Sequence, residues 1–221
     1  MQESFLADAA LRRTFIASTS HPRFSRYLSA SGGDEMRAIA VYRWNTRLSQ
    51  ALYPTPQAWE ICLRNRLSGF LSWKYGQSWI YQDQRMLRQS TQPDRARLVE
   101  ARCRQEVLRT VKQAPSSAVI ADLSADFWVS LLSRHYTVPH VWRHNLARIF
   151  PLDASLDQRA AWSICNDLLL RNRIAHHEPI FHGPLDHRHD DLMRLIAGMC
   201  AGTHAYARSV CGFDRIWSDR P

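Results

Sequence analysis

Residues 168–181 of the chain read Leu-Leu-Leu-Arg-Asn-Arg-Ile-Ala-His-His-Glu-Pro-Ile-Phe. The first part of this stretch is apolar, which is typical of a buried helix, and the second part gathers basic and acid–base side chains. Pro179 ends the pattern, because the residue before a proline is displaced from the helical region of backbone space. The stretch therefore predicts a long helix whose carboxyl end carries functional groups.

A helical wheel separates the polar residues of this predicted helix, 156–176. With about 100° per residue, small and apolar residues gather in one stripe of the helix: Ala161, Ile164, Cys165, Leu168 and Ala175. Arg171 and Asn172 fall inside that stripe, His176 lies at its edge, and His177 points to the opposite, solvent-facing side. A buried charge needs compensation, so we expect Arg171 to contact a carboxylate or a bound anion.

A second predicted helix, Pro56–Tyr75, places a charge of opposite sign among apolar residues. Glu60 falls within its buried stripe, and Arg64 lies near the stripe's edge, where it can pair with Glu60 four residues away. We expect the two helices to pack together, so that Glu60 meets Arg171 in one polar pocket. The alternative is a buried ion pair that fixes the helix register and has no catalytic role.

The remaining sequence predicts further helices and no strand. Ser31-Gly32-Gly33 ends one helical pattern, and Asp34 is a plausible N-cap for the next helix, which extends to Leu52. Residues 82–113 are densely charged and predict an exposed basic helix or hairpin, which could equally be a solvated surface or a nucleic-acid surface. We therefore expect one all-α domain over residues 1–221: a core at about 23–210, the basic helical insertion at 82–113, and a loosely docked tail at 211–221.

Charge and composition narrow the class of partner. The chain of 221 residues carries 29 Lys and Arg against 20 Asp and Glu, a net charge of +9, which favours nucleic acid as the partner and a membrane surface second. The cysteines are odd in number and widely spaced, which indicates reduced thiols in a cytoplasmic protein: Cys62, Cys103, Cys165, Cys200 and Cys211. No signal-peptide pattern is present, and no apolar run approaches the ~20 residues of a membrane-spanning helix.

Arginine, asparagine and histidine together suit cleavage of a phosphodiester. His176 would transfer a proton, and Arg171 would stabilise the charge that develops on the phosphate. The 2′-hydroxyl of RNA is an internal nucleophile, so no metal and no other cofactor is required. One histidine cannot serve as separate acid and base, but a homodimer that joins two such helix ends would supply both.

The pattern Arg171-Asn172-x-x-x-His176 resembles the signature of the HEPN superfamily, in which four to six residues separate an arginine from a histidine. With the segments 59–65 and 126–132, the wider stretch resembles the bacterial Abi-like (abortive-infection) proteins of that superfamily. The resemblance extends from about Arg23 to Phe181.

This resemblance implies a HEPN-like helical bundle with additional helices, a homodimer with both motifs in one cleft, and metal-independent endoribonuclease activity. The setting would be a toxin or antiphage system, in which an antitoxin or another partner could restrain the activity. The implied catalytic residues are Arg171, Asn172 and His176, supported by Glu60, Arg64 and Asn65. His177 also fits the spacing and is the second choice for the acid–base group.

Three other readings stay open. Five of the ten histidines lie close together in sequence, which could indicate a metal hydrolase: His176, His177, His182, His187 and His189. His187 with Asp190 or Asp191 has helical spacing for shared ligation, although no His-Glu-x-x-His motif is present. The chain could instead be a catalytically silent RNA- or protein-binding module. Membrane binding is the least supported reading, because no basic amphipathic terminus is present.

Overall fold

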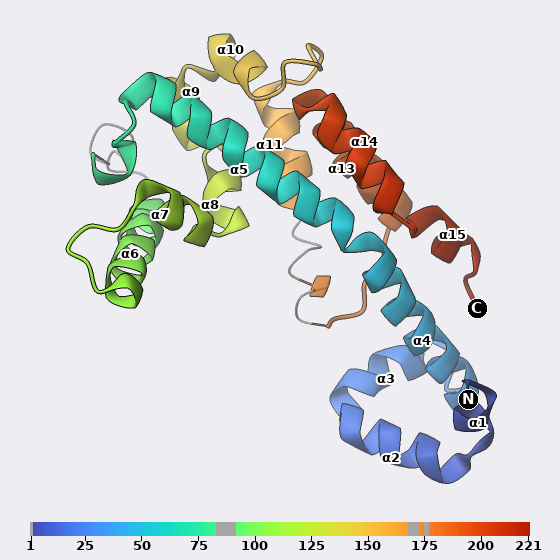
Figure 1. Ribbon diagram of the computed structural model, residues 1–221. Helices are drawn as coiled ribbons and strands as arrows, with labels where there is room; N and C mark the ends of the chain where they lie inside the picture. The colour runs from blue at the N-terminus through green and yellow to red at the C-terminus, as the bar shows by residue number, and fades with distance from the viewer. Residues whose placement is uncertain (1, 83–91, 168–172, 175–176) are drawn as a thin grey trace. The chain divides into compact units, whose positions relative to one another are not determined.

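The structure is a computed structural model that describes residues 2–82, 92–167, 173–174 and 177–221 (Figure 1). Every regular element among these residues is a helix, which confirms the predicted all-α class. The helices group into two compact units, a division that the expectation of a single domain does not include. The first unit comprises the described residues of 1–53, 170–185 and 211–221, and the second comprises those of 54–169 and 186–210. The HEPN-like arrangement of the helices stays a prediction.

The first unit contains five labelled helices: α1 (Gln2–Ala7), α2 (Ala9–Thr19), α3 (His21–Ala30), α4 (Glu35–Leu52) and α15 (Phe213–Ser218). The Asp34 carboxylate accepts the backbone N–H of Arg37 at 3.0 Å, which confirms Asp34 as the N-cap of α4. Gly32 and Gly33 before it have positive φ, which glycine adopts without steric cost and which ends α3. Asp8 caps α2 in the same way, accepting the N–H groups of Ala10 and Leu11.

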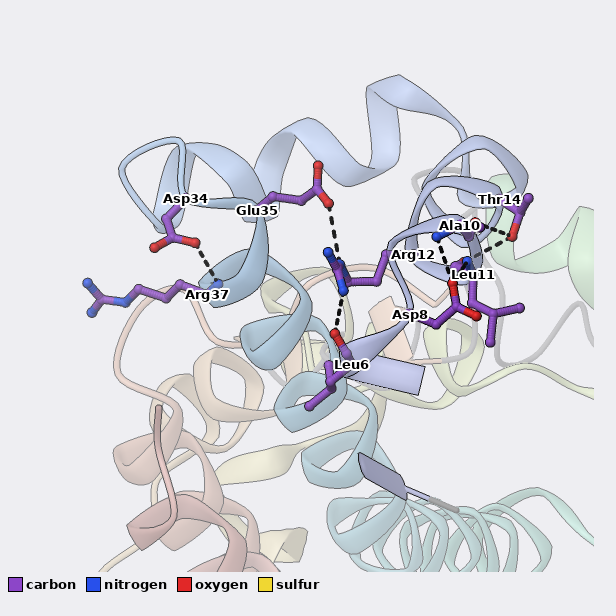
Figure 2. Close-up of polar contacts among 9 residues, drawn as sticks. All are labelled: Leu6, Asp8, Ala10, Leu11, Arg12, Thr14, Asp34, Glu35 and Arg37. Carbon is purple, nitrogen blue, oxygen red and sulfur yellow. Dashed lines mark hydrogen bonds and ion pairs between the residues drawn. The ribbon is translucent and has the colours of Figure 1, made fainter. Parts of the chain in front are cut away.

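Arg12 connects three helices of the first unit (Figure 2). From α2 it donates a hydrogen bond to the carbonyl of Leu6 in α1, and its Nε lies 3.8 Å from a carboxylate oxygen of Glu35 at the start of α4. Together these contacts fix the N-terminal helices against α4.

The C-terminal tail is part of the core of the first unit. Phe213 and Ile216 of α15 are buried, and Trp44 Nε1 of α4 donates a hydrogen bond to the carbonyl of Ile216 at 2.7 Å. The Trp217 ring lies 5.6 Å from that of Trp44. The prediction of a loosely docked tail is therefore wrong: the apolar residues at 213, 216 and 217 form one face of a short helix, and that face packs on α4.

The second unit is built on the 22-residue helix α5 (Pro54–Tyr75). The unit also contains the α-helices α6 (Gln92–Arg109), α7 (Ser116–Asp122), α8 (Ala125–Ser130), α9 (Thr137–His140), α10 (Trp142–Asn145), α11 (Gln158–Asp167), α13 (Leu185–Met199, except Leu185 itself) and α14 (Ala201–Val210). Helix α5 begins two residues before the predicted start, Pro56, and Thr55 is buried inside its first turn.

The basic helical insertion, residues 82–113, is partly buried in its described part. Leu98 and Ala101 of α6 belong to the core of the second unit, and Arg104 Nε contacts the Asp122 carboxylate of α7 at 2.9 Å. Val107 and Leu108, in the last turn of α6, are exposed. The described part of 82–113 is thus a docked helix with one solvated face.

Candidate functional site

The three predicted catalytic residues, Arg171, Asn172 and His176, lie outside the described residues, and so does the predicted contact of Arg171 with Glu60. Helix α11, which precedes them in the sequence, has the buried face that the helical wheel predicts. In α11, Ala161 and Cys165 are fully buried.

The supporting residues on α5 belong to the second unit. Glu60 and Arg64 are half-buried, close to the positions that the wheel predicts, whereas Asn65 is exposed. Arg64 Nε is buried without a hydrogen-bond partner among the described residues. A buried donor of this kind has the capacity to bind an acceptor.

His177 belongs to the first unit and is exposed, as the wheel predicts. Residues 173 and 174 are helical, the N–H of His177 donates to the carbonyl of Ile174 at 3.0 Å, and the N–H of Glu178 donates to the carbonyl of Arg173 at 2.8 Å. These two hydrogen bonds form a Schellman motif, with His177 at the left-handed position, φ 56°, that glycine usually occupies. The helix therefore ends at the place predicted from Pro179.

The segment that follows this helix end is anchored in the core. Ile174, Ile180 and Phe181 are buried, and the Phe181 ring lies 5.5 Å from that of Tyr27 in α3. The N–H of Ile180 donates to the buried Oδ1 of Asn45 in α4 at 2.9 Å. Helices α3 and α4 thus hold the chain on both sides of His177.

A groove of about 590 Å³ opens beside His177. Its lining residues come from α3, α4 and the helix end, and they include Arg23, Tyr42, Thr46, Gln50, Tyr53 and His177. A second hollow of about 480 Å³ shares Arg23 and adds Arg26 and Glu178. The lining offers cations, hydroxyls and amides, which are the groups that bind phosphate and sugar oxygens.

The electrostatics of this region favour an anion. Partial burial lowers the pKa of His182, and the positive charges of Arg173 and Arg26 lower it further. Burial, with the neighbouring Tyr42, raises the pKa of Tyr27 to about 12 against the opposing effect of the arginines. Tyr27 therefore keeps its proton at neutral pH and cannot serve as a base.

The sequence did not indicate the contribution of α3 and α4 to this groove. Arg23, Arg26 and Asn45 lie in ordinary amphipathic helices, and they approach the helix end only through tertiary packing. The i, i+3 spacing of Arg23 and Arg26 places both on one helix face, which is the one local signal that could have pointed to them.

Among the described residues, no group of three His, Cys, Asp or Glu side chains is arranged to hold a metal ion. No helix within the described ranges is long and apolar enough to cross a membrane.

Compared with family models, curated proteins and solved structures, the chain matches none of them. The resemblance to Abi-like proteins of the HEPN superfamily therefore stays a prediction. The function has to be argued from the residues themselves.

Proposed function

We propose that this chain is a metal-independent endoribonuclease of HEPN type with a toxin or antiphage role. The observation that carries the proposal is the exposed His177 on a core-anchored helix end, beside a groove that also contains Arg23. The overall charge of +9 supports an RNA partner.

The reaction needs few groups. A base removes the proton of a ribose 2′-hydroxyl, the resulting oxygen attacks the adjacent phosphorus, and an acid protonates the leaving 5′-oxygen. We assign the acid–base role to His176, with His177 as the second choice, and we assign stabilisation of the phosphate charge to Arg171, with Asn172 beside it. The product ends in a 2′,3′-cyclic phosphate.

A homodimer completes the proposal, because two helix ends would supply one acid and one base. Glu60, Arg64 and Asn65 are proposed to support the catalytic residues. A regulatory partner such as an antitoxin would act by covering the groove. The cytoplasm is the proposed location, consistent with five cysteines, all within the described residues, of which none forms a disulfide.

The test is cleavage of a labelled RNA, and of DNA with the same sequence, in excess chelator. We expect cleavage of the RNA only, because DNA lacks the 2′-hydroxyl. His176→Ala and Arg171→Ala should each lower the rate about 100-fold or more. His187→Ala removes an exposed histidine of α13 and should leave the rate unchanged.

The other outcomes are equally clear. Full activity in both His176→Ala and His177→Ala would show that neither histidine is the acid–base group, and the proposal would fail. Activity that disappears with chelator and returns with zinc or manganese would identify a metal hydrolase. RNA binding without cleavage would identify a silent binding module.

A further inference from the structure

The helical segment 185–210 is interrupted at Cys200. Helix α13 ends at Met199 and α14 begins at Ala201 (Figure 1). The N–H of Cys200 still donates to the carbonyl of Ile196 at 2.9 Å, and its own carbonyl accepts the N–H of His204 at 3.0 Å. Cys200 is therefore the residue at which one helix ends, and it is also the N-cap of the ten-residue helix α14.

Because the helix is interrupted, the carbonyl of Met199 and the N–H of Thr203 have other hydrogen-bond partners than in a continuous helix. In a continuous helix the carbonyl of Met199 would accept the N–H of Thr203. Here Arg66 of α5 donates to that carbonyl, and the N–H of Thr203 donates to Cys200 Sγ at 3.5 Å. A sulfur thus takes the capping position that Ser, Thr, Asp or Asn usually fills. A neutral thiol is a weak acceptor, so this cap favours the thiolate.

The surroundings of Cys200 stabilise that thiolate. The hydroxyl and the N–H of Thr203, the N–H of Gly202 and the charge of Arg66 lower the pKa of the Cys200 thiol. Cys200 is also half-exposed, so reagents can reach it. Cys165 is the opposite case, because complete burial raises its pKa to about 12. Low pKa combined with access is the condition for a reactive cysteine.

A second cysteine lies at the same place. Cys62 of α5 and Cys200 line one groove of about 360 Å³ together with Arg66 and Thr203. Thr203 of α14 lies in the same groove as both sulfurs, and α14 packs against α5. Burial raises the pKa of the Cys62 thiol, so that Cys62 stays protonated at neutral pH.

We propose that Cys200 and Cys62 form a peroxide-reactive pair, in which Cys200 is the attacking thiolate and Cys62 the resolving thiol. This inference goes beyond the proposed RNA cleavage and does not depend on it. The sulfur of Cys200 attacks one oxygen of hydrogen peroxide, the O–O bond breaks, and a sulfenic acid forms while the released hydroxide becomes water. The sulfur of Cys62 then attacks the sulfur of Cys200, the S–O bond breaks, and the hydroxide leaves with the Cys62 proton as a second water. The two thiols lose two electrons, which peroxide accepts.

The test uses the reduced, full-length protein at pH 7 with one equivalent of peroxide, followed by alkylation and trypsin digestion. We expect a disulfide between the peptides 48–64 and 195–208, with the mass of two hydrogen atoms lost, and reversal by dithiothreitol. Cys62→Ser should instead accumulate a sulfenic acid at Cys200 that dimedone traps. Cys200→Ser, which keeps a capping oxygen, should abolish oxidation of Cys62.

Two further variants separate this proposal from non-specific oxidation. Cys103→Ser removes an exposed thiol of α6 and should leave the disulfide yield unchanged. Iodoacetamide should modify Cys200 about threefold faster than Cys103, or more, and Thr203→Val should remove that advantage. Equal rates at the two cysteines, or oxidation of Cys200 in Cys62→Ser without trapped sulfenic acid, would overturn the assignment.

Discussion

The buried amide oxygen of Asn45 accepts a hydrogen bond from the N–H of Ile180, 2.9 Å away and 135 residues later in the sequence. Ile180 follows His177 by three residues. The position of the exposed histidine therefore depends on a side chain of α4, and a change at Asn45 should affect both stability and activity.

Replacement of Asn45 by alanine leaves the buried N–H of Ile180 without an acceptor. We expect a loss of about 1–3 kcal/mol in the free energy of unfolding, and slower RNA cleavage because the turn at His177 loosens. Thr46→Ala is the matched control for stability, since the Thr46 hydroxyl is exposed and donates to the Tyr42 carbonyl of its own helix. Urea denaturation measures both variants, and an equal midpoint for the two would contradict the role assigned to Asn45.

Arg23 and Arg26 are predicted to contact RNA phosphates. Arg23→Glu and Arg26→Glu should each weaken binding of 2′-O-methyl RNA, which cannot be cleaved. Each should also reduce the slope of log K against log salt concentration by about 1, because about one fewer counterion is released on binding. Arg208→Glu makes the same charge change on an exposed position of α14, in the second unit, and should have a smaller effect. Binding measured at several salt concentrations checks this, and equal effects of all three substitutions would indicate a non-specific charge effect.

The tail should stabilise the first unit by apolar burial rather than by ion pairing. Ile216 is 4% exposed, so Ile216→Ala should cost about 2–4 kcal/mol. Asp219, whose carboxylate lies 3.5 Å from Arg47 Nη2 on the surface, should contribute less than about 1 kcal/mol. Hydrogen exchange of the α4 amides compares Ile216→Ala with Asp219→Ala, and a larger effect of the latter would refute this reading.

His140 should make the second unit sensitive to acid. Burial, with the nearby Lys74, lowers its pKa from 6.5 to about 3. The unfolded chain binds the proton more readily, so the stabilisation is complete above about pH 6.5 and is lost as the pH falls toward 3. At pH 4 this loss amounts to roughly 3 kcal/mol.

His140→Asn keeps an acceptor for the Tyr75 hydroxyl, which lies 3.1 Å from His140 Nδ1, and removes the titrating group. The variant should be less stable at pH 7, because its smaller side chain leaves a cavity, but its stability should change less between pH 6.5 and 4. His135→Asn, at an exposed position nearby in sequence, should retain the acid sensitivity of the unmodified protein. Urea titrations across this pH range measure the difference.

Local signals predicted much of the fold. The start of α4 follows from Gly33 and the Asp34 cap, and the turn at His177 follows from Pro179. These features depend on interactions within a few residues, which sequence patterns report directly. The spacing of 213, 216 and 217 is a local signal for α15, but a pattern this short does not show that the helix packs on α4.

Features created by distant partners could not be predicted. The break between α13 and α14 depends on Arg66, which donates to the carbonyl of Met199 from 133 residues earlier in the sequence. It also depends on Leu152, whose N–H donates to the carbonyl of Gly198 at 3.0 Å. The groove at His177 likewise depends on α3 and α4. A single sequence contains no local pattern that pairs such positions.

The first unit joins segments from the beginning, the later middle and the end of the chain. Trp44 leaves the ribosome early, yet the carbonyl that its indole N–H contacts, that of Ile216, is synthesised 172 residues later. A nascent chain therefore cannot close the core that supports His177 until translation of α15 is finished. The core behind the groove is thus completed late in synthesis, after every other segment of the first unit has been made.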